Sequence, residues 1–88
     1  MKIKPIDGLE AKLKASEDAE ELGDKHYALD LYDNDPALTL EIEFTPKGIF
    51  VPAAALLKYS DELQGYYMDE RIKDIAVIES ALHAWMAM

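Results

Sequence analysis

The residues best suited to chemistry are the acids around one predicted turn, Asp30, Asp33 and Asp35. Closely spaced carboxylates are the ligands that Ca²⁺ prefers, and the segment DNDPALTLEIEF has the length of an EF-hand loop. That loop needs glycine at its sixth position and glutamate at its twelfth, whereas this segment lacks the glycine and ends in Phe44. Pro36 stiffens the turn instead. We interpret the acids as ordinary turn residues and predict no metal site.

Other catalytic groups are sparse. His26 and His83 are the only histidines, and their spacing matches no metal-binding motif. The serines, Ser16, Ser60 and Ser80, lack the sequence context of a nucleophile elbow, and the four glycines form no phosphate-binding loop. We therefore expect neither an enzyme nor a cofactor.

Charge is the strongest feature of the composition. Eighteen acids and nine bases give a net charge of −9, and residues 1–45 contain 12 of the acids but only five bases. Such a field repels nucleic acid and anionic membranes and attracts basic protein surfaces. The simpler interpretation is that the acids keep a small protein soluble, and composition does not choose between the two.

The length and composition predict one small domain, residues 1–88. Half of the residues are apolar, which argues against disorder, and there is no cysteine, which is typical of a reducing compartment. No apolar run approaches the roughly 20 residues that span a membrane. We therefore expect a cytoplasmic protein.

The segment His26–Val51 is predicted to form a three-stranded antiparallel meander, because apolar and polar residues alternate along it. Pairing Tyr32 with Ala37 places every apolar side chain opposite an apolar partner: Leu31 opposite Leu38, Leu29 opposite Leu40, and Tyr27 opposite Ile42. The same register places His26 opposite Glu43 on the other face. A shift of one residue would destroy this agreement.

The third strand is predicted to be short, Ile49 to Val51, after a turn at Pro46 and Lys47. A two-residue loop sends Ile49 and Val51 into the core and Phe50 to the acidic face, while a three-residue loop with a bulge sends Phe50 inward. We favour the two-residue loop because it buries two branched side chains.

Helices are predicted before and after the meander in the sequence. The first runs from Asp7, as N-cap, to Leu22; the second begins at Pro52 and breaks or ends at Ser60 or Gly65; the third begins after Asp69. The third helix has a core stripe at Ile72, Ile75, Ile78, Leu82 and Trp85. The predicted fold class is α+β: a three-stranded antiparallel β-meander with helices packed on one face, in the order α-β-β-β-α-α.

The function predicted from these surfaces is that of an acidic inhibitor or modulator that occupies a cationic, nucleic-acid-binding surface of a partner protein. In size and charge the chain resembles small phage-encoded antidefence inhibitors, such as anti-CRISPR and DNA-mimic proteins. The expected contacts are seven acids with an aromatic anchor: Glu17, Glu20, Glu21, Asp24, Asp30, Glu41 and Glu43, with Tyr32.

An alternative function is that of a self-associating structural or assembly protein. From Ile75 to Met88 only three residues are polar, so this helix is apolar nearly all round. Its second apolar stripe would form a homodimer interface at Val77, Ala81, Ala84 and Met88.

Overall fold

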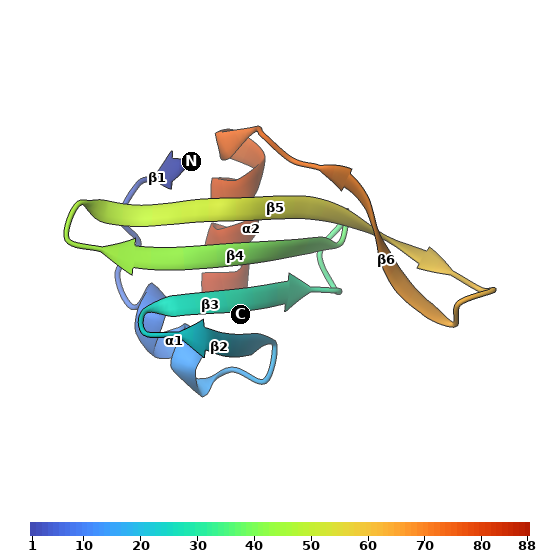
Figure 1. Ribbon diagram of the computed structural model, residues 1–88, viewed down its shortest axis with the longest axis horizontal. Helices are drawn as coiled ribbons and strands as arrows, with labels where there is room; N and C mark the ends of the chain where they lie inside the picture. Colours follow the sequence, from blue (N-terminus) through green and yellow to red (C-terminus); the bar gives the residue numbers. More distant parts are fainter.

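The computed structural model describes all 88 residues and contains a six-stranded antiparallel sheet with two helices. The predicted fold class is therefore wrong: strands dominate, and the sheet has twice the expected number. The elements are β1 Lys2–Ile3, α1 Leu9–Ala15, β2 Ala19–Gly23, β3 His26–Leu31, β4 Leu38–Thr45, β5 Gly48–Ser60, β6 Gly65–Arg71 and α2 Ile75–Met86 (Figure 1).

The centre of the sheet has the register that the alternating pattern predicts. Leu31 pairs with Leu38, and the other two apolar pairs follow in step, so that all six side chains are buried. The turn to β5 has two residues, since Thr45 pairs with Gly48. Ile49 and Val51 are buried, and Phe50 lies half-buried on the opposite face, as expected for this loop.

The first predicted helix is wrong beyond Ala15, and its N-cap is Gly8 rather than the predicted Asp7. There the chain turns extended at Ser16, whose hydroxyl accepts a hydrogen bond from the Asp18 amide at 3.0 Å. Ala19–Gly23 then forms β2, which pairs with β3. Acids crowd this segment, and their mutual repulsion opposes a helix; a strand lets them point to alternate faces.

The second predicted helix does not exist, because the chain continues through Pro52 as the 13-residue strand β5. On the side of β4, Val51 and Pro52 of β5 lie opposite a single residue, Ile42, and this bulge in β5 accommodates the proline. On the other edge of β5, β1 pairs with Phe50 and Ile49, while β6 pairs from Ala55 onward. Pro52 lies in the gap between these partners, where its lack of an N–H group breaks no ladder hydrogen bond.

The far half of β5 and the whole of β6 form a hairpin that projects beyond the rest of the sheet (Figure 1). The far half of β5 contains residues that favour a helix, but its pairing with β4 and β6 makes it a strand. The hairpin side chains are largely exposed, including Leu63 and Met68 at 68% and 66%.

The C-terminal helix α2 begins later than predicted, after Asp74 rather than Asp69. The Asp74 carboxylate accepts a hydrogen bond from the Ala76 amide at 3.0 Å, which caps the first turn. Of the predicted core stripe, Ile78, Leu82 and Trp85 are buried, Ile72 is half-buried before the helix, and Ile75 is exposed.

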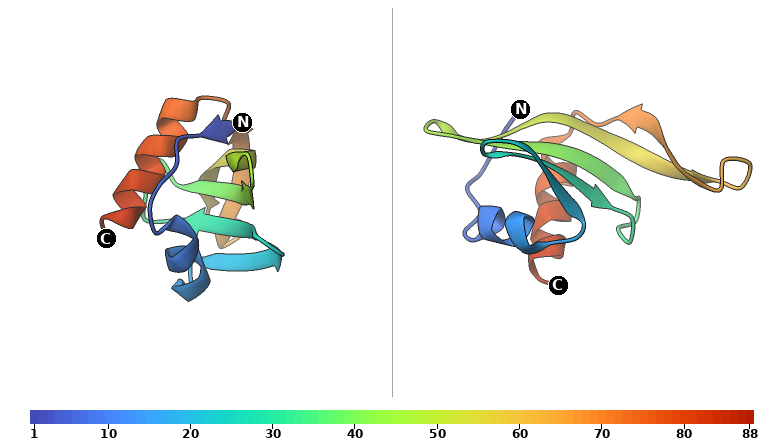
Figure 2. Two further views of the ribbon diagram at one scale, coloured as in Figure 1. Left: turned by 90° about the vertical axis from the view of Figure 1, so that its left-hand side faces the viewer. Right: turned by 60° about the horizontal axis from the view of Figure 1, so that its bottom comes forward.

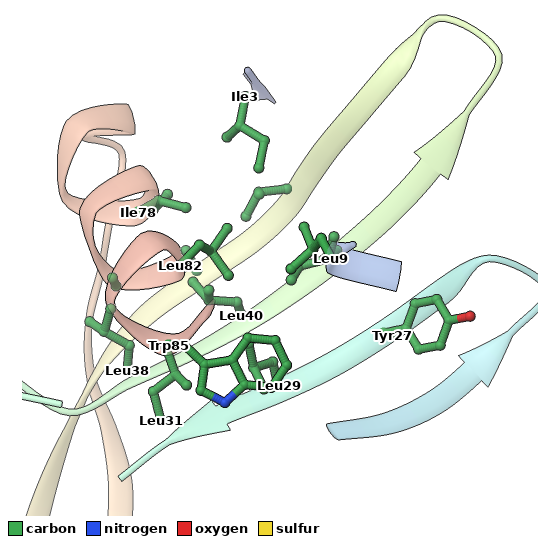
Figure 3. Close-up of a cluster of buried hydrophobic side chains, with 14 of the residues drawn as sticks. Ile3, Leu9, Tyr27, Leu29, Leu31, Leu38, Leu40, Ile78, Leu82 and Trp85 are labelled. Atoms are coloured by element: carbon green, nitrogen blue, oxygen red, sulfur yellow. The ribbon is translucent and has the colours of Figure 1, made fainter. Parts of the chain in front are cut away.

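Both helices cover the same face of the sheet, which we call the inner face (Figure 2). Leu9 and Leu13 of α1 join the buried residues of α2 and of the central strands in one core cluster (Figure 3). The opposite, outer face carries no helix. Neither helix is both long and apolar enough to cross a membrane.

Candidate functional site

The outer face brings together four of the predicted contact residues, Glu20, Asp30, Glu41 and Glu43. Directly paired residues of an antiparallel sheet point to the same side. Ala28 lies between two buried residues and so points outward; it pairs with Glu20 on β2 and with Glu41 on β4. Three neighbouring strands therefore present acids across one surface, separated by small side chains.

One histidine lies within this acidic surface. His26 is opposite Glu43 in the register, but its Nε2 lies 3.2 Å from Oε1 of Glu41, diagonally across the strand pair. Both side chains are partly exposed, although Nε2 of His26 is itself buried and forms no hydrogen bond. This is the only ion pair in the protein, and the other outer-face carboxylates have no cationic partner.

The remaining predicted acids lie elsewhere. Glu17 is exposed in the connection before β2, and Asp24 is exposed in the turn between β2 and β3. Glu21 pairs with Tyr27 and lines a small hollow with Leu13 of α1, so it belongs to the helix side of the sheet. The acidic surface that the sequence suggested is thus divided between two faces.

Tyr32, the predicted anchor, is half-exposed and belongs to a cluster of three tyrosines. Its ring centroid lies 4.8 Å from that of Tyr66 on β6, and Tyr66 meets Tyr59 of β5 edge-on at 5.4 Å. All three rings keep 43–55% of their surface exposed. The sequence does not predict Tyr59 and Tyr66 at this site, because Tyr59 falls in the second predicted helix and Tyr66 in the predicted connection between the second and third helices.

The Tyr32 hydroxyl is oriented by Asp30, which accepts its hydrogen bond at 3.4 Å and a second one from Thr39 at 2.7 Å. The negative charge of Asp30 raises the pKa of Tyr32, and burial and the hydrogen bond act in the same direction. The phenol is therefore neutral at physiological pH.

A cavity of about 260 Å³ opens beside Tyr32, between the end of β3 and the last turns of α2. Three acidic residues are among those that line it, Asp18, Asp30 and Asp33. Its apolar walls come from Leu31 and from α2: Ala81, Ala84, Trp85 and Met88. An apolar cavity with acids at its mouth suits a cationic group carried on an apolar stem.

On the inner side of β3, the Tyr27 ring is buried and its hydroxyl donates a 3.0 Å hydrogen bond to Glu10 of α1. Burial raises the pKa of Tyr27 to about 12, and the hydrogen bond and charge of Glu10 add to the shift. This contact fixes α1 to the sheet and contributes nothing to the outer surface.

The predicted dimer stripe on α2 is interrupted. Val77 and Met88 are 39% and 79% exposed, and Ala84 is also exposed, whereas Ala81 is 5% exposed and packs in the core. Ala81 therefore has little surface left for a second chain to cover.

The histidines and acids do not gather into any group of three that could hold a metal ion. Known protein-family models, curated proteins and solved structures give no match to this chain.

Proposed function

We propose that the protein is an acidic protein-binding modulator that docks through its outer sheet face onto a cationic surface of a partner. The observation that carries the proposal is the uncovered face on which Glu20, Asp30, Glu41 and Glu43 converge from three adjacent strands. A rigid sheet fixes the positions from which these side chains project, so little backbone entropy is lost when a partner binds.

The partner surface would be one that otherwise binds nucleic acid phosphates. The spacing between neighbouring strands is about 4.8 Å and side chains on one face repeat about every 7 Å along a strand, so the carboxylates form a two-dimensional array of negative charge. Occupying such a surface blocks it both sterically and electrostatically, and the affinity should fall as salt rises.

A capture experiment with three baits tests the proposal. The baits are the wild-type protein, the outer-face variant Glu20→Gln/Glu41→Gln/Glu43→Gln, and a control variant with the same charge change at exposed sites away from this face, Asp7→Asn/Asp61→Asn/Glu62→Gln. Proteins from a cell lysate are captured at low salt, identified by mass spectrometry, and then challenged with high salt or with double-stranded DNA.

The proposal expects a protein that the wild type and the control retain, that the outer-face variant loses, and that added DNA displaces. Equal retention by the outer-face variant would refute it. Equal loss from both variants would also refute it, because that result would show dependence on total charge rather than on the outer face.

Self-association through α2 is the second candidate, supported by the exposure of Val77, Ala84 and Met88 along the helix. A Val77→Glu/Ala84→Glu variant would then have half the mass of the wild type in light scattering. Equal masses would exclude this dimer.

A further inference from the structure

The cavity between β3 and α2 is a distinct element of the surface, next to the outer face. β2 is shorter than β3, and its last contact in this direction is the hydrogen bond from the Asp30 amide to the Asp18 carbonyl at 3.0 Å. Beyond Asp18 the edge of β3 is open, so Leu31 and Tyr32 border the cavity directly. The exposed tyrosine cluster extends the rim of the cavity along β6.

The charges around the cavity favour a cation. Three acidic residues line it and no lysine, arginine or histidine does so. None of the three forms an ion pair, although the Asp30 carboxylate already accepts hydrogen bonds from Tyr32 and Thr39. The last turn of α2 also contributes, because the carbonyl groups at a helix C-terminus carry partial negative charge.

One cation of this chain already uses that helix end. Lys12 of α1 donates hydrogen bonds to the carbonyl oxygens of Trp85 and Met88, and its Nζ lies 4.7 Å from the centroid of the Trp85 ring. Lys12 does not line the cavity, so a second cation could enter from the Tyr32 side without displacing it.

We propose that this cavity receives an arginine side chain of the protein partner. This proposal rests on the proposed function and identifies one contact at the edge of the outer face. The apolar walls suit the methylene stem, and Tyr32 offers an aromatic face at the mouth. Arginine fits better than lysine, because a planar guanidinium stacks on an aromatic ring and donates two parallel hydrogen bonds to a carboxylate such as Asp33.

Titrations of the full-length, ¹⁵N-labelled protein with capped amino acids test this directly. The probes are Nα-acetyl-arginine amide, the matching lysine amide, and the matching citrulline amide, which has nearly the shape of arginine but no charge. Backbone amide shifts are followed at residues 31–34 and 84–88. Arginine should shift these amides saturably, lysine should bind roughly two- to fivefold more weakly, and citrulline should not bind.

Two variants with matched controls locate the site. Tyr32→Ala should weaken arginine binding roughly two- to fivefold, the effect of one exposed cation–π contact, while Tyr67→Ala should not. Asp33→Asn should weaken it by a similar factor, while Asp35→Asn, at the acid two positions further along the same loop and outside the cavity, should not.

The proposal is overturned if arginine produces no saturable shifts, if citrulline binds equally well, or if the control variants weaken binding as much as their counterparts. The outer-face variant Glu20→Gln/Glu41→Gln/Glu43→Gln leaves the cavity lining intact. It should therefore still bind the arginine probe, so that failure of the outer-face proposal and failure of this one are separate results.

Discussion

Replacing two outer-face acids should stabilise the protein even if it weakens partner binding. Glu20→Gln/Glu43→Gln removes two neighbours of Glu41 and leaves the contact between Glu41 and His26 in place. The matched control, Asp61→Asn/Glu62→Gln, makes the same change in net charge at exposed positions between β5 and β6.

The gain follows from the spacing of the carboxylates. Glu41 and Glu43 point to the same face two residues apart, about 7 Å, and Glu20 lies two strand spacings from Glu41, about 10 Å. Repulsion at these separations in a water-like dielectric is about 0.6 and 0.4 kcal/mol, so the variant should gain about 1 kcal/mol at low salt. For a domain of this size, that corresponds to a rise of about 4–8 °C in Tm.

Thermal unfolding followed by circular dichroism at pH 8 measures the gain. In about 10 mM salt the Debye length is about 30 Å and the full gain is expected, whereas in 0.5 M salt screening should remove most of it. A variant that melts at or below the wild-type temperature in low salt would refute the clustering of charge. If the gain in stability persists at high salt, its cause is packing rather than charge. If the control gains equally, its cause is net charge rather than clustering on the outer face.

Three further predictions concern the fold. Leu29→Ala should lower the free energy of unfolding by about 2–5 kcal/mol, because this side chain is fully buried. Leu63→Ala, at an exposed position, should change it by less than about 0.5 kcal/mol. Equal effects of the two variants in urea denaturation would contradict the burial of Leu29 in the core. Asp74→Ala should cost about 1 kcal/mol by removing the cap of α2, and Asp69→Ala, at the position first expected to be the cap, should be nearly neutral in the same assay. The pKa of Tyr27 is raised from 10.0 to about 12, so the contribution of this shift to stability is complete below pH 10 and is lost as the pH rises through 12. The loss of stability with rising pH should therefore be less steep in Tyr27→Phe than in the wild type. Identical dependence of stability on alkaline pH in the two proteins would contradict this assignment.

The sequence was informative where side chains alternate and face one another. The register of β3 with β4 could be predicted because only one alignment buries Tyr27, Leu29 and Leu31 against apolar partners. The direction of Phe50 followed from the same reasoning about the turn. These are local pairings, joined by short connections, and few alternatives compete with them.

The sequence misled where local propensity and tertiary pairing disagree. Residues 53–60 contain three alanines and two leucines, which favour a helix, yet they continue β5 because β4 and β6 satisfy their backbone groups. Residues 19–23 also form a strand, because pairing with β3 satisfies their backbone groups. The predicted site was incomplete as a consequence: Tyr66 reaches Tyr32 only because β6 folds back as a strand.

The position of α2 in the chain has a consequence for folding during synthesis. This helix follows all six strands, yet it supplies Ile78, Leu82 and Trp85 to the shared core. Its contacts with the start of the chain, such as the 2.9 Å hydrogen bond from the Lys4 amide to Glu79, span 75 residues. A nascent chain therefore carries its strands with an apolar face that only α1 partly covers until α2 emerges, and apolar surface exposed during that interval favours aggregation.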